Sequence, residues 1–129
     1  TLPFSKRQVY ISLDPYCPQA IEEDLTETIN ALIAEGFRYW VVNNPAHIGM
    51  LRGKKATMIA GPYLYTFNRW AASWLENQNI ETFITPIENS RKNLEATFEA
   101  SLRKKVMITL FAYPALFRIP KLKLSLCAI

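Results

Sequence analysis

The residues of this chain that could carry chemistry stand directly after short apolar runs. In sequence order they are Asp14, Asn43, Asn44, Gly61, Pro62, Thr85, Pro86, Glu88 and Tyr113. If the apolar runs are parallel strands, their carboxyl ends share one rim, where ligands bind in βα folds. Asp, Asn and Pro are also the ordinary residues of turns and helix starts. A shared functional rim and a set of separate turns are therefore both open at this point.

Glu88 and Asn68 are the candidate catalytic residues. The carboxylate of Glu88 could act as a general base or a metal ligand, and it could equally stabilise a helix N-terminus through the helix dipole. Asn68 lies near the start of a predicted helix, where its amide could cap the helix or orient a substrate. Asn43, Asn44 and Tyr113 are the candidate substrate-binding residues, with Tyr113 as a polar aromatic wall.

The sequence lacks the motifs of several catalytic and metal-binding classes. His47 is the only histidine, which excludes a two-histidine metal site within this segment and favours a loop or helix-start role. No G-x-S-x-G, G-x-G-x-x-G or P-loop motif occurs. The two cysteines, Cys17 and Cys127, show no C-x-x-C spacing, so we expect no metal site and no cofactor within this segment alone. A reduced, cytoplasmic setting is expected.

Strand and helix patterns alternate along the chain. Apolar runs rich in strand-forming residues predict strands at 8–13, 38–44, 55–61, 81–86 and 106–114. Helical spacing predicts helices at 19–36, 46–53, within 60–76 and at 87–105, and Gly36 is expected to end the first of them. This alternation predicts an α/β fold with a parallel sheet, either open or the second half of a TIM-like barrel.

Two tryptophans dominate the helix predicted within 60–76. Phe67, Trp70, Ala71, Trp74 and Leu75 fall at i, i+3, i+4, i+7 and i+8, which is one apolar stripe of a helix. We expect this stripe to pack on the sheet, with a stacking platform for a ligand as the less favoured alternative.

Length and composition predict one α/β domain spanning residues 1–129. Half of the 129 residues are apolar, and the net charge of +4 falls well short of a nucleic-acid-binding signature. Lys104, Lys105, Arg118, Lys121 and Lys123 are expected to form a solvated basic face, with an RNA or anion contact as the alternative. No apolar run is long enough to span a membrane. The missing initiator Met and the apolar last residues favour a segment excised from a longer chain.

Three stretches of the sequence resemble the collagenase-like peptidase family (peptidase family U, number thirty-two). They are LIAEGFRYWVVNNPAHIGMLRG, MIAGPYLYTFNRWAASWLENQNIETFITPIENSRKNLEA and VMITLFAYPALF. In the second stretch, Gly61, Leu64 and Asn68 match the family's segment of Gly, Leu and Asn. The resemblance covers residues 31–117 and consists of several weak motifs in the right order.

Two further elements of that family have counterparts here. Pro86 and Glu88, followed by Asn89, correspond to its SPE(N) element, although Ile87 stands between the proline and the glutamate. The YPALF stretch at 113–117 takes the place of its PLM element.

The resemblance implies a segment from the second half of a TIM-like barrel and a peptide hydrolase acting on collagen-like substrates. The family offers no agreed catalytic dyad to carry over. Other relatives are hydroxylases of RNA bases or ubiquinone precursors that hold an iron–sulfur cluster on four cysteines. Cys127 is placed similarly to the first of those cysteines and Cys17 is not, so such a cluster would need cysteines of the full-length protein.

Two interpretations of the function therefore stand. The chain is either an enzyme segment that acts on a peptide or protein substrate, or a binding or scaffold module that recognises a protein, an RNA or a partner subunit. A half barrel has two unpaired sheet edges, and exposed edges pair readily with another chain. We therefore expect a homodimer formed through these edges.

Overall fold

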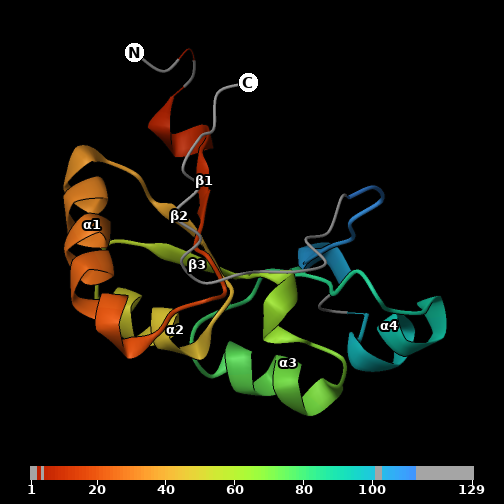
Figure 1. Cartoon of the computed structure of the whole chain (residues 1–129). Coiled ribbons are helices and arrows are strands. Elements are labelled where there is room, and N and C mark those ends of the chain that lie inside the picture. The colour runs from red at the N-terminus through yellow and green to blue at the C-terminus, as the bar shows by residue number, and fades with distance from the viewer. Residues whose placement is uncertain (1–2, 4, 101–102, 113–129) are drawn as a thin grey trace, which may run out of the picture.

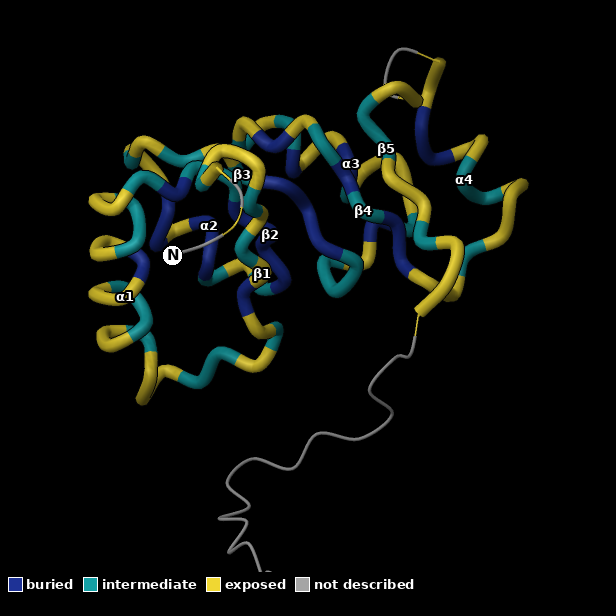
Figure 2. Tube along the Cα trace, turned by 90° about the horizontal axis from the view of Figure 1, so that it is seen from above, coloured by how far each residue is buried: buried dark blue, intermediate teal, exposed yellow. Residues whose placement is uncertain are grey.

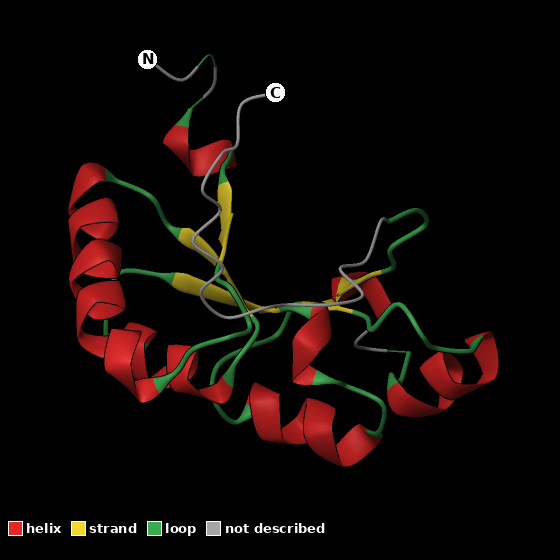
Figure 3. Cartoon of the chain, in the orientation of Figure 1, coloured by secondary structure: helices red, strands yellow, loops and turns green. Residues whose placement is uncertain are grey.

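The computed structural model describes residue 3, residues 5–100 and residues 103–112 of the chain. The strands are β1 (Tyr10–Ser12), β2 (Tyr39–Val42), β3 (Thr57–Ala60), β4 (Phe83–Ile84) and β5 (Val106–Met107). The α-helices are α1 (Glu22–Glu35), α2 (Pro45–Leu51), α3 (Arg69–Glu76) and α4 (Arg91–Thr97). Short 3-10 helices are η1 (Lys6–Gln8), η2 (Gln19–Ile21), η3 (Pro62–Leu64) and η4 (Arg103–Lys105). Strands and helices alternate as predicted (Figure 3).

The five strands form one sheet in which every pair of neighbours is parallel. Their order in the sheet is their order in the chain, β1-β2-β3-β4-β5. Figure 1 shows the four α-helices following one another in an arc along one side of this sheet. The predicted α/β fold with a parallel sheet is therefore confirmed.

The strand register separates the sheet into a helix-covered face and an opposite face. Trp40 pairs with Met58, and Val42 pairs with Ala60, so these side chains share one face. They contribute to the core under the helices. Val41 and Ile59, which alternate with them, point to the opposite face. The two faces can therefore be read directly from the pairing of β2 with β3.

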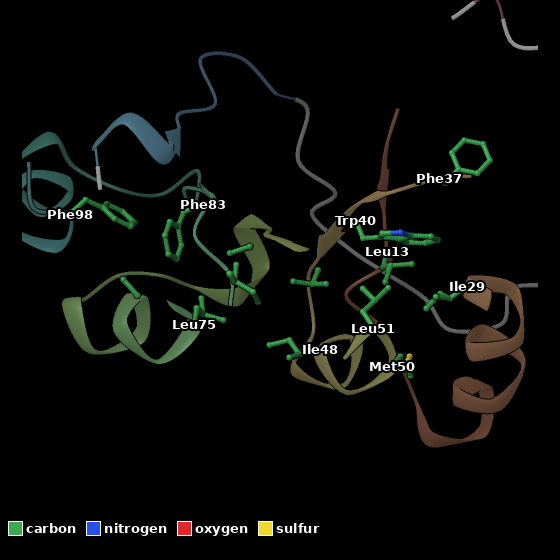
Figure 4. Close-up of a cluster of buried hydrophobic side chains, with 14 residues drawn as sticks. Leu13, Ile29, Phe37, Trp40, Ile48, Met50, Leu51, Leu75, Phe83 and Phe98 are labelled. Atoms are coloured by element: carbon green, nitrogen blue, oxygen red, sulfur yellow. The ribbon is translucent and has the colours of Figure 1, made fainter. Parts of the chain in front are cut away.

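A single apolar cluster joins the sheet to the helices (Figure 4). Trp40 and Leu13 meet at the β1–β2 side, and Phe83 lies against Phe98 at the α4 side. Trp40 and Phe83 are fully buried. Burying a side chain of this kind contributes roughly 2 kcal/mol, before the entropy of ordering the chain is counted. Figure 2 shows buried strand segments beside an α1 whose outer turns are exposed.

Helix α1 begins and ends at the signals that its sequence carries. Glu22, Glu23 and Asp24 occupy its first turn, where negative charge is favoured by the helix dipole. Gly36 ends the helix in a left-handed conformation with φ of 108°, and its N–H donates to the carbonyls of Ile33 and Leu32. The predicted glycine stop is confirmed.

The predicted inner stripe of α3 is wrong for its two tryptophans and right for Leu75. Trp70 is 81% exposed and Trp74 is 49% exposed, whereas Ala72 and Leu75 are buried. The small Ala72 side chain allows the helix backbone to lie close to the core, and a tryptophan at that position would need more room. The helix therefore turns its two indole rings to the outside, and they are free for contact with a ligand or partner.

Helix α4 and strand β5 are shorter than predicted. The helix ends at Thr97 instead of near Lys105, because Phe98 adopts an extended conformation with φ of −106° and ψ of 111°. This turn away from the helix places the Phe98 ring 5.4 Å from that of Phe83, at an interplanar angle of 50°. Strand β5 is Val106–Met107, whereas the prediction extended to residue 114, part of which lies outside the described residues.

Candidate functional site

Asn43 follows β2 at its carboxyl end, on the face of the sheet opposite the helices. Its Nδ2 donates hydrogen bonds to the Leu13 carbonyl at 2.8 Å and to the Ser12 hydroxyl at 3.1 Å. The residue is 5% exposed. The Asn43 amide therefore ties the ends of β1 and β2 together and is held in one orientation by both bonds. The structure thus places this predicted substrate-binding residue at the strand ends, as expected.

Gly61 lies beside Asn43, at the end of β3. A Cβ atom at position 61 would lie 1.8 Å from Asn43 Oδ1 and 3.0 Å from Val41 Cγ1. Such contacts are far inside van der Waals distance, so only glycine leaves room for the Asn43 side chain. Asn43, Gly61 and Ser12 form the strand-end site, which is the best-defined polar constellation at this rim.

His47 supports this site from the first turn of α2. The backbone N–H of Asn43 donates to His47 Nδ1 at 3.3 Å, so the proton of the neutral imidazole lies on Nε2. His47 is fully buried, and neither its Nε2 nor Asn43 Oδ1 has a hydrogen-bond partner among the described residues. Burial lowers the pKa of His47, and the carboxylate of Asp14 opposes part of that effect. The structure therefore holds His47 in its neutral form.

The stability of the fold is expected to fall on acidification because of His47. The imidazole has a pKa near 6.5 in the unfolded chain and a lower pKa in the folded chain. As the pH falls, the unfolded chain therefore takes up a proton before the folded chain does. The contribution is complete above pH 6.5 and is lost as the pH falls below it, by up to about 1.4 kcal/mol per pH unit. Urea unfolding at a series of pH values measures this loss. His47→Asn, which keeps an acceptor for the Asn43 N–H, should flatten the dependence, and an unchanged slope in that variant would contradict the assignment.

Asn44 has a structural task at the start of α2. Its Oδ1 accepts from the Ala46 N–H at 3.0 Å, and its Nδ2 donates to the Pro15 carbonyl at 3.0 Å. The first bond caps the helix, and the second fixes the loop after β1. Asn44 therefore lies next to the strand-end site in sequence, but its amide oxygen and its amide nitrogen both already form hydrogen bonds within the chain.

Asn68 caps α3. Its Oδ1 accepts from the Ala71 N–H at 2.9 Å, and the residue is exposed. This bond satisfies one of the free N–H groups at the helix start. The amide nitrogen of Asn68 makes no hydrogen bond to a described residue, so it remains a donor directed at solvent or a ligand.

Glu88 lies in the loop between β4 and α4, where it is exposed. It has no hydrogen bond or ion pair with any described residue, and none joins it to Asn68 or Asn43. The two loops are nevertheless tied together, because Asn93 Nδ2 donates to the Phe67 carbonyl at 2.9 Å and to Asn89 Oδ1 at 2.8 Å. The predicted site residues thus fall into a strand-end group around Asn43 and a loop group around Asn68.

The remaining candidates are a tyrosine and the cysteines. Tyr113 and Cys127 lie outside the described residues. Cys17 is half-buried and free, and its thiol pKa is raised by burial and by the charge of Glu22. An iron–sulfur cluster needs several thiolates together, so the described residues do not fit one. Nor does that part of the chain group three His, Cys, Asp or Glu residues as a metal site would require.

Ser12 and Gly61 show what the sequence patterns missed. Ser12 was absent from the candidates because it stands inside a strand, where a polar residue every second position normally means a solvated face. Gly61 stands among the predicted rim residues, but the sequence does not show that its missing side chain makes room for Asn43. Their meeting with Asn43 depends on the register that aligns Val41 with Ser12 and Ile59. That register sets Asn43 beside Gly61 and places Ser12 two residues earlier, level with Val41 on the same face of the sheet.

No described helix is both long enough and apolar enough to cross a membrane. Comparison of the chain with known protein families, with curated proteins and with solved structures finds no match.

Proposed function

We propose that this chain forms part of a TIM-like βα barrel and binds a peptide at the carboxyl ends of its strands, as part of a peptide hydrolase of the collagenase-like type. The strand-end site carries the proposal. Its amide is oriented by the Leu13 carbonyl and Ser12, and Asn43 Oδ1 has no partner in the described residues. That oxygen is buried in the unliganded chain, so binding requires the rim around it to move aside, and a peptide N–H is then the type of donor that it accepts.

The topology supports the barrel part of this proposal. Neighbouring strands follow chain order, and the α-helices lie along one side of the sheet (Figure 1). A doubly wound sheet reverses its strand order and has helices on both faces, whereas a barrel keeps one order and one helical layer. In a barrel, ligands bind at the carboxyl ends of the strands, which is where Asn43 and Gly61 lie.

In this proposal Glu88 acts as the general base. Its carboxylate lies in a loop at the same rim and forms no ion pair with a described residue. It takes a proton from the water that attacks the peptide carbonyl, and the resulting carboxylic acid gives that proton to the amine that leaves as the C–N bond breaks. Asn43 fixes the substrate backbone. Asn68 keeps the neighbouring loop in place by capping α3. General-base catalysis of this kind contributes about 100-fold or more to the rate.

Hydrolysis of fluorescently labelled gelatin by the full chain tests the proposal. Glu88→Gln should lower kcat by about 100-fold and leave KM within about twofold, because the proton acceptor is lost while the binding amide stays. Asn43→Ala should raise KM. The matched control is Glu99→Gln, an exposed carboxylate near the end of α4, which should retain full activity. Equal activity of wild type and Glu88→Gln would remove Glu88 from the mechanism.

The exposure of Glu88 favours a second candidate function, a peptide-binding module without hydrolysis. An exposed carboxylate with no described partner is not oriented for proton transfer in this structure. The same gelatin experiment separates the candidates. Retention of gelatin on an immobilised chain, lost in Asn43→Ala and accompanied by no cleavage, would identify the module.

A further inference from the structure

A groove of about 340 Å³ lies between the start of α3 and one side of α4. Its walls are residues 67–70 on the first element and Asn93, Ala96 and Thr97 on the second. The groove is held open by a fixed frame, since Asn93 Nδ2 and the Thr97 hydroxyl both donate to the Phe67 carbonyl, at 2.9 and 3.2 Å. Its volume lies at the lower end of the range of small-ligand sites.

Trp70 gives this groove an exposed aromatic wall. The residue is 81% exposed, although tryptophan is on average one of the more buried residues. The face of an indole ring carries the negative part of its quadrupole, so it attracts C–H groups with slight positive charge that lie flat against it. Trp74, one turn further along α3, is also exposed but does not line the groove. Phe67 also lines the groove, but it is half-buried and its ring stacks on that of Tyr65, so Trp70 is the more exposed aromatic surface for a ligand.

Two amides line the groove, and each has one atom without a hydrogen bond to a described residue. Asn68 Oδ1 is occupied by the Ala71 N–H, which leaves Asn68 Nδ2 as a donor. Asn93 has the reverse arrangement, because its Nδ2 donates to Phe67 and Asn89, which leaves its Oδ1 as an acceptor. A hydroxyl group both donates and accepts. A ligand with neighbouring hydroxyl groups therefore offers a matching partner to each amide.

The charge of the groove selects a neutral ligand. Arg69 is its one charged lining residue, and Glu99 lies 3.9 Å from the Arg69 guanidinium. A nucleic acid would need several free cations along its phosphates. A proline-rich peptide offers carbonyl acceptors but few N–H donors, which would leave Asn93 Oδ1 unmatched.

We propose that the α3–α4 groove binds a pyranose ring of a neutral carbohydrate, stacked on Trp70 and hydrogen-bonded by Asn68 and Asn93. This site shares Asn68 with the loop group, but sugar binding does not require hydrolysis at the strand ends.

Titration of the full chain with cellohexaose, N-acetylchitohexaose and maltohexaose tests this site by tryptophan fluorescence and calorimetry. We expect at least one of them to bind, with a shift in the emission of the exposed indole and little change in affinity with salt. Trp70→Ala should weaken binding by about tenfold or more, and Trp70→Phe should weaken it less because a ring face remains. Asn68→Ser should also weaken binding, since serine keeps the helix cap but lacks the amide donor.

Trp74→Ala is the matched control, because Trp74 lies on the same helix but outside the groove. It should leave the affinity within about twofold. Three results would each overturn the proposal: no binding of any of the three sugars up to about 10 mM, an equal loss in Trp74→Ala and Trp70→Ala, or binding of a proline-rich peptide or an RNA oligonucleotide in place of the sugars. Thermal unfolding of each variant shows that the losses do not come from misfolding.

Discussion

Gly61→Ala is expected to lower the free energy of unfolding by about 3 kcal/mol. The new methyl group would occupy the position of the Asn43 amide, because it would lie 1.8 Å from Oδ1 and 2.6 Å from Cγ. Asn43 would have to rotate away, and its bonds to the Leu13 carbonyl and the Ser12 hydroxyl would break. The strand ends would lose the link that orders the candidate site. Urea unfolding of the variant measures the loss.

A matched glycine and a double-mutant cycle make this prediction specific. Gly49 lies within α2 with no atom within 4 Å of an added Cβ, so Gly49→Ala should stabilise the fold by about 0.5–1 kcal/mol. In the Asn43→Ala background the clash disappears except for the 3.0 Å contact with Val41, and Gly61→Ala should then cost less than about 1 kcal/mol. Additive effects of the two substitutions would show that the Asn43 side chain does not rely on Gly61.

Peptide hydrolysis responds to the same substitution if the proposed function is right. Gly61→Ala moves the Asn43 amide without removing any group that takes part in proton transfer. The expected kinetic signature is therefore a raised KM with a smaller change in kcat, which differs from the loss of kcat in Glu88→Gln. The contact between Gly61 and the Asn43 side chain therefore affects both the stability of the fold and binding at the strand ends.

The alternation of strands and helices could be predicted because it depends on local patterns. The apolar runs and the glycine at position 36 specify their elements through interactions within a few residues. The strand-end site depends on register, since Asn43 and Gly61 are separated in sequence and meet only when β2 and β3 align. Sequence patterns place both residues after strands, but they do not show that one side chain fills the space above the other.

The inner face of α3 was mispredicted for a different reason. Hydrophobicity ranks Trp70 and Trp74 above Ala72, so the apolar stripe is drawn through the tryptophans. Packing instead selects Ala72, together with Leu75 of the predicted stripe, because their volumes fit the space next to the sheet. The end of α4 likewise follows from a tertiary contact, because Phe98 leaves the helix to reach Phe83. Helix faces and ends chosen by packing partners lie beyond what periodicity can predict.

Phe83→Ala is expected to lower the free energy of unfolding by about 4 kcal/mol, the typical cost of removing a fully buried phenylalanine. Phe83 is fully buried and occupies one of the two positions of β4. It pairs with Ala60 of β3 and Val106 of β5, and its ring contacts Phe98 after α4. A cavity at this point would separate β4 from both neighbours and from the helix. Urea unfolding, with hydrogen exchange of the α4 amides, measures both effects.

The Phe83–Phe98 pair should also show coupling in a double-mutant cycle. Each ring removed alone leaves the other beside a cavity, so the double variant should be less destabilised than the sum by about 1 kcal/mol. Ile87→Ala, in the exposed loop after β4, is the control and should change stability by less than about 0.5 kcal/mol. If Phe83→Ala removes protection only from α4 and leaves global stability unchanged, α4 unfolds independently of the rest. The groove between α3 and α4 would then open without unfolding the strand-end site, because Asn93 and Thr97 belong to the helix that is released.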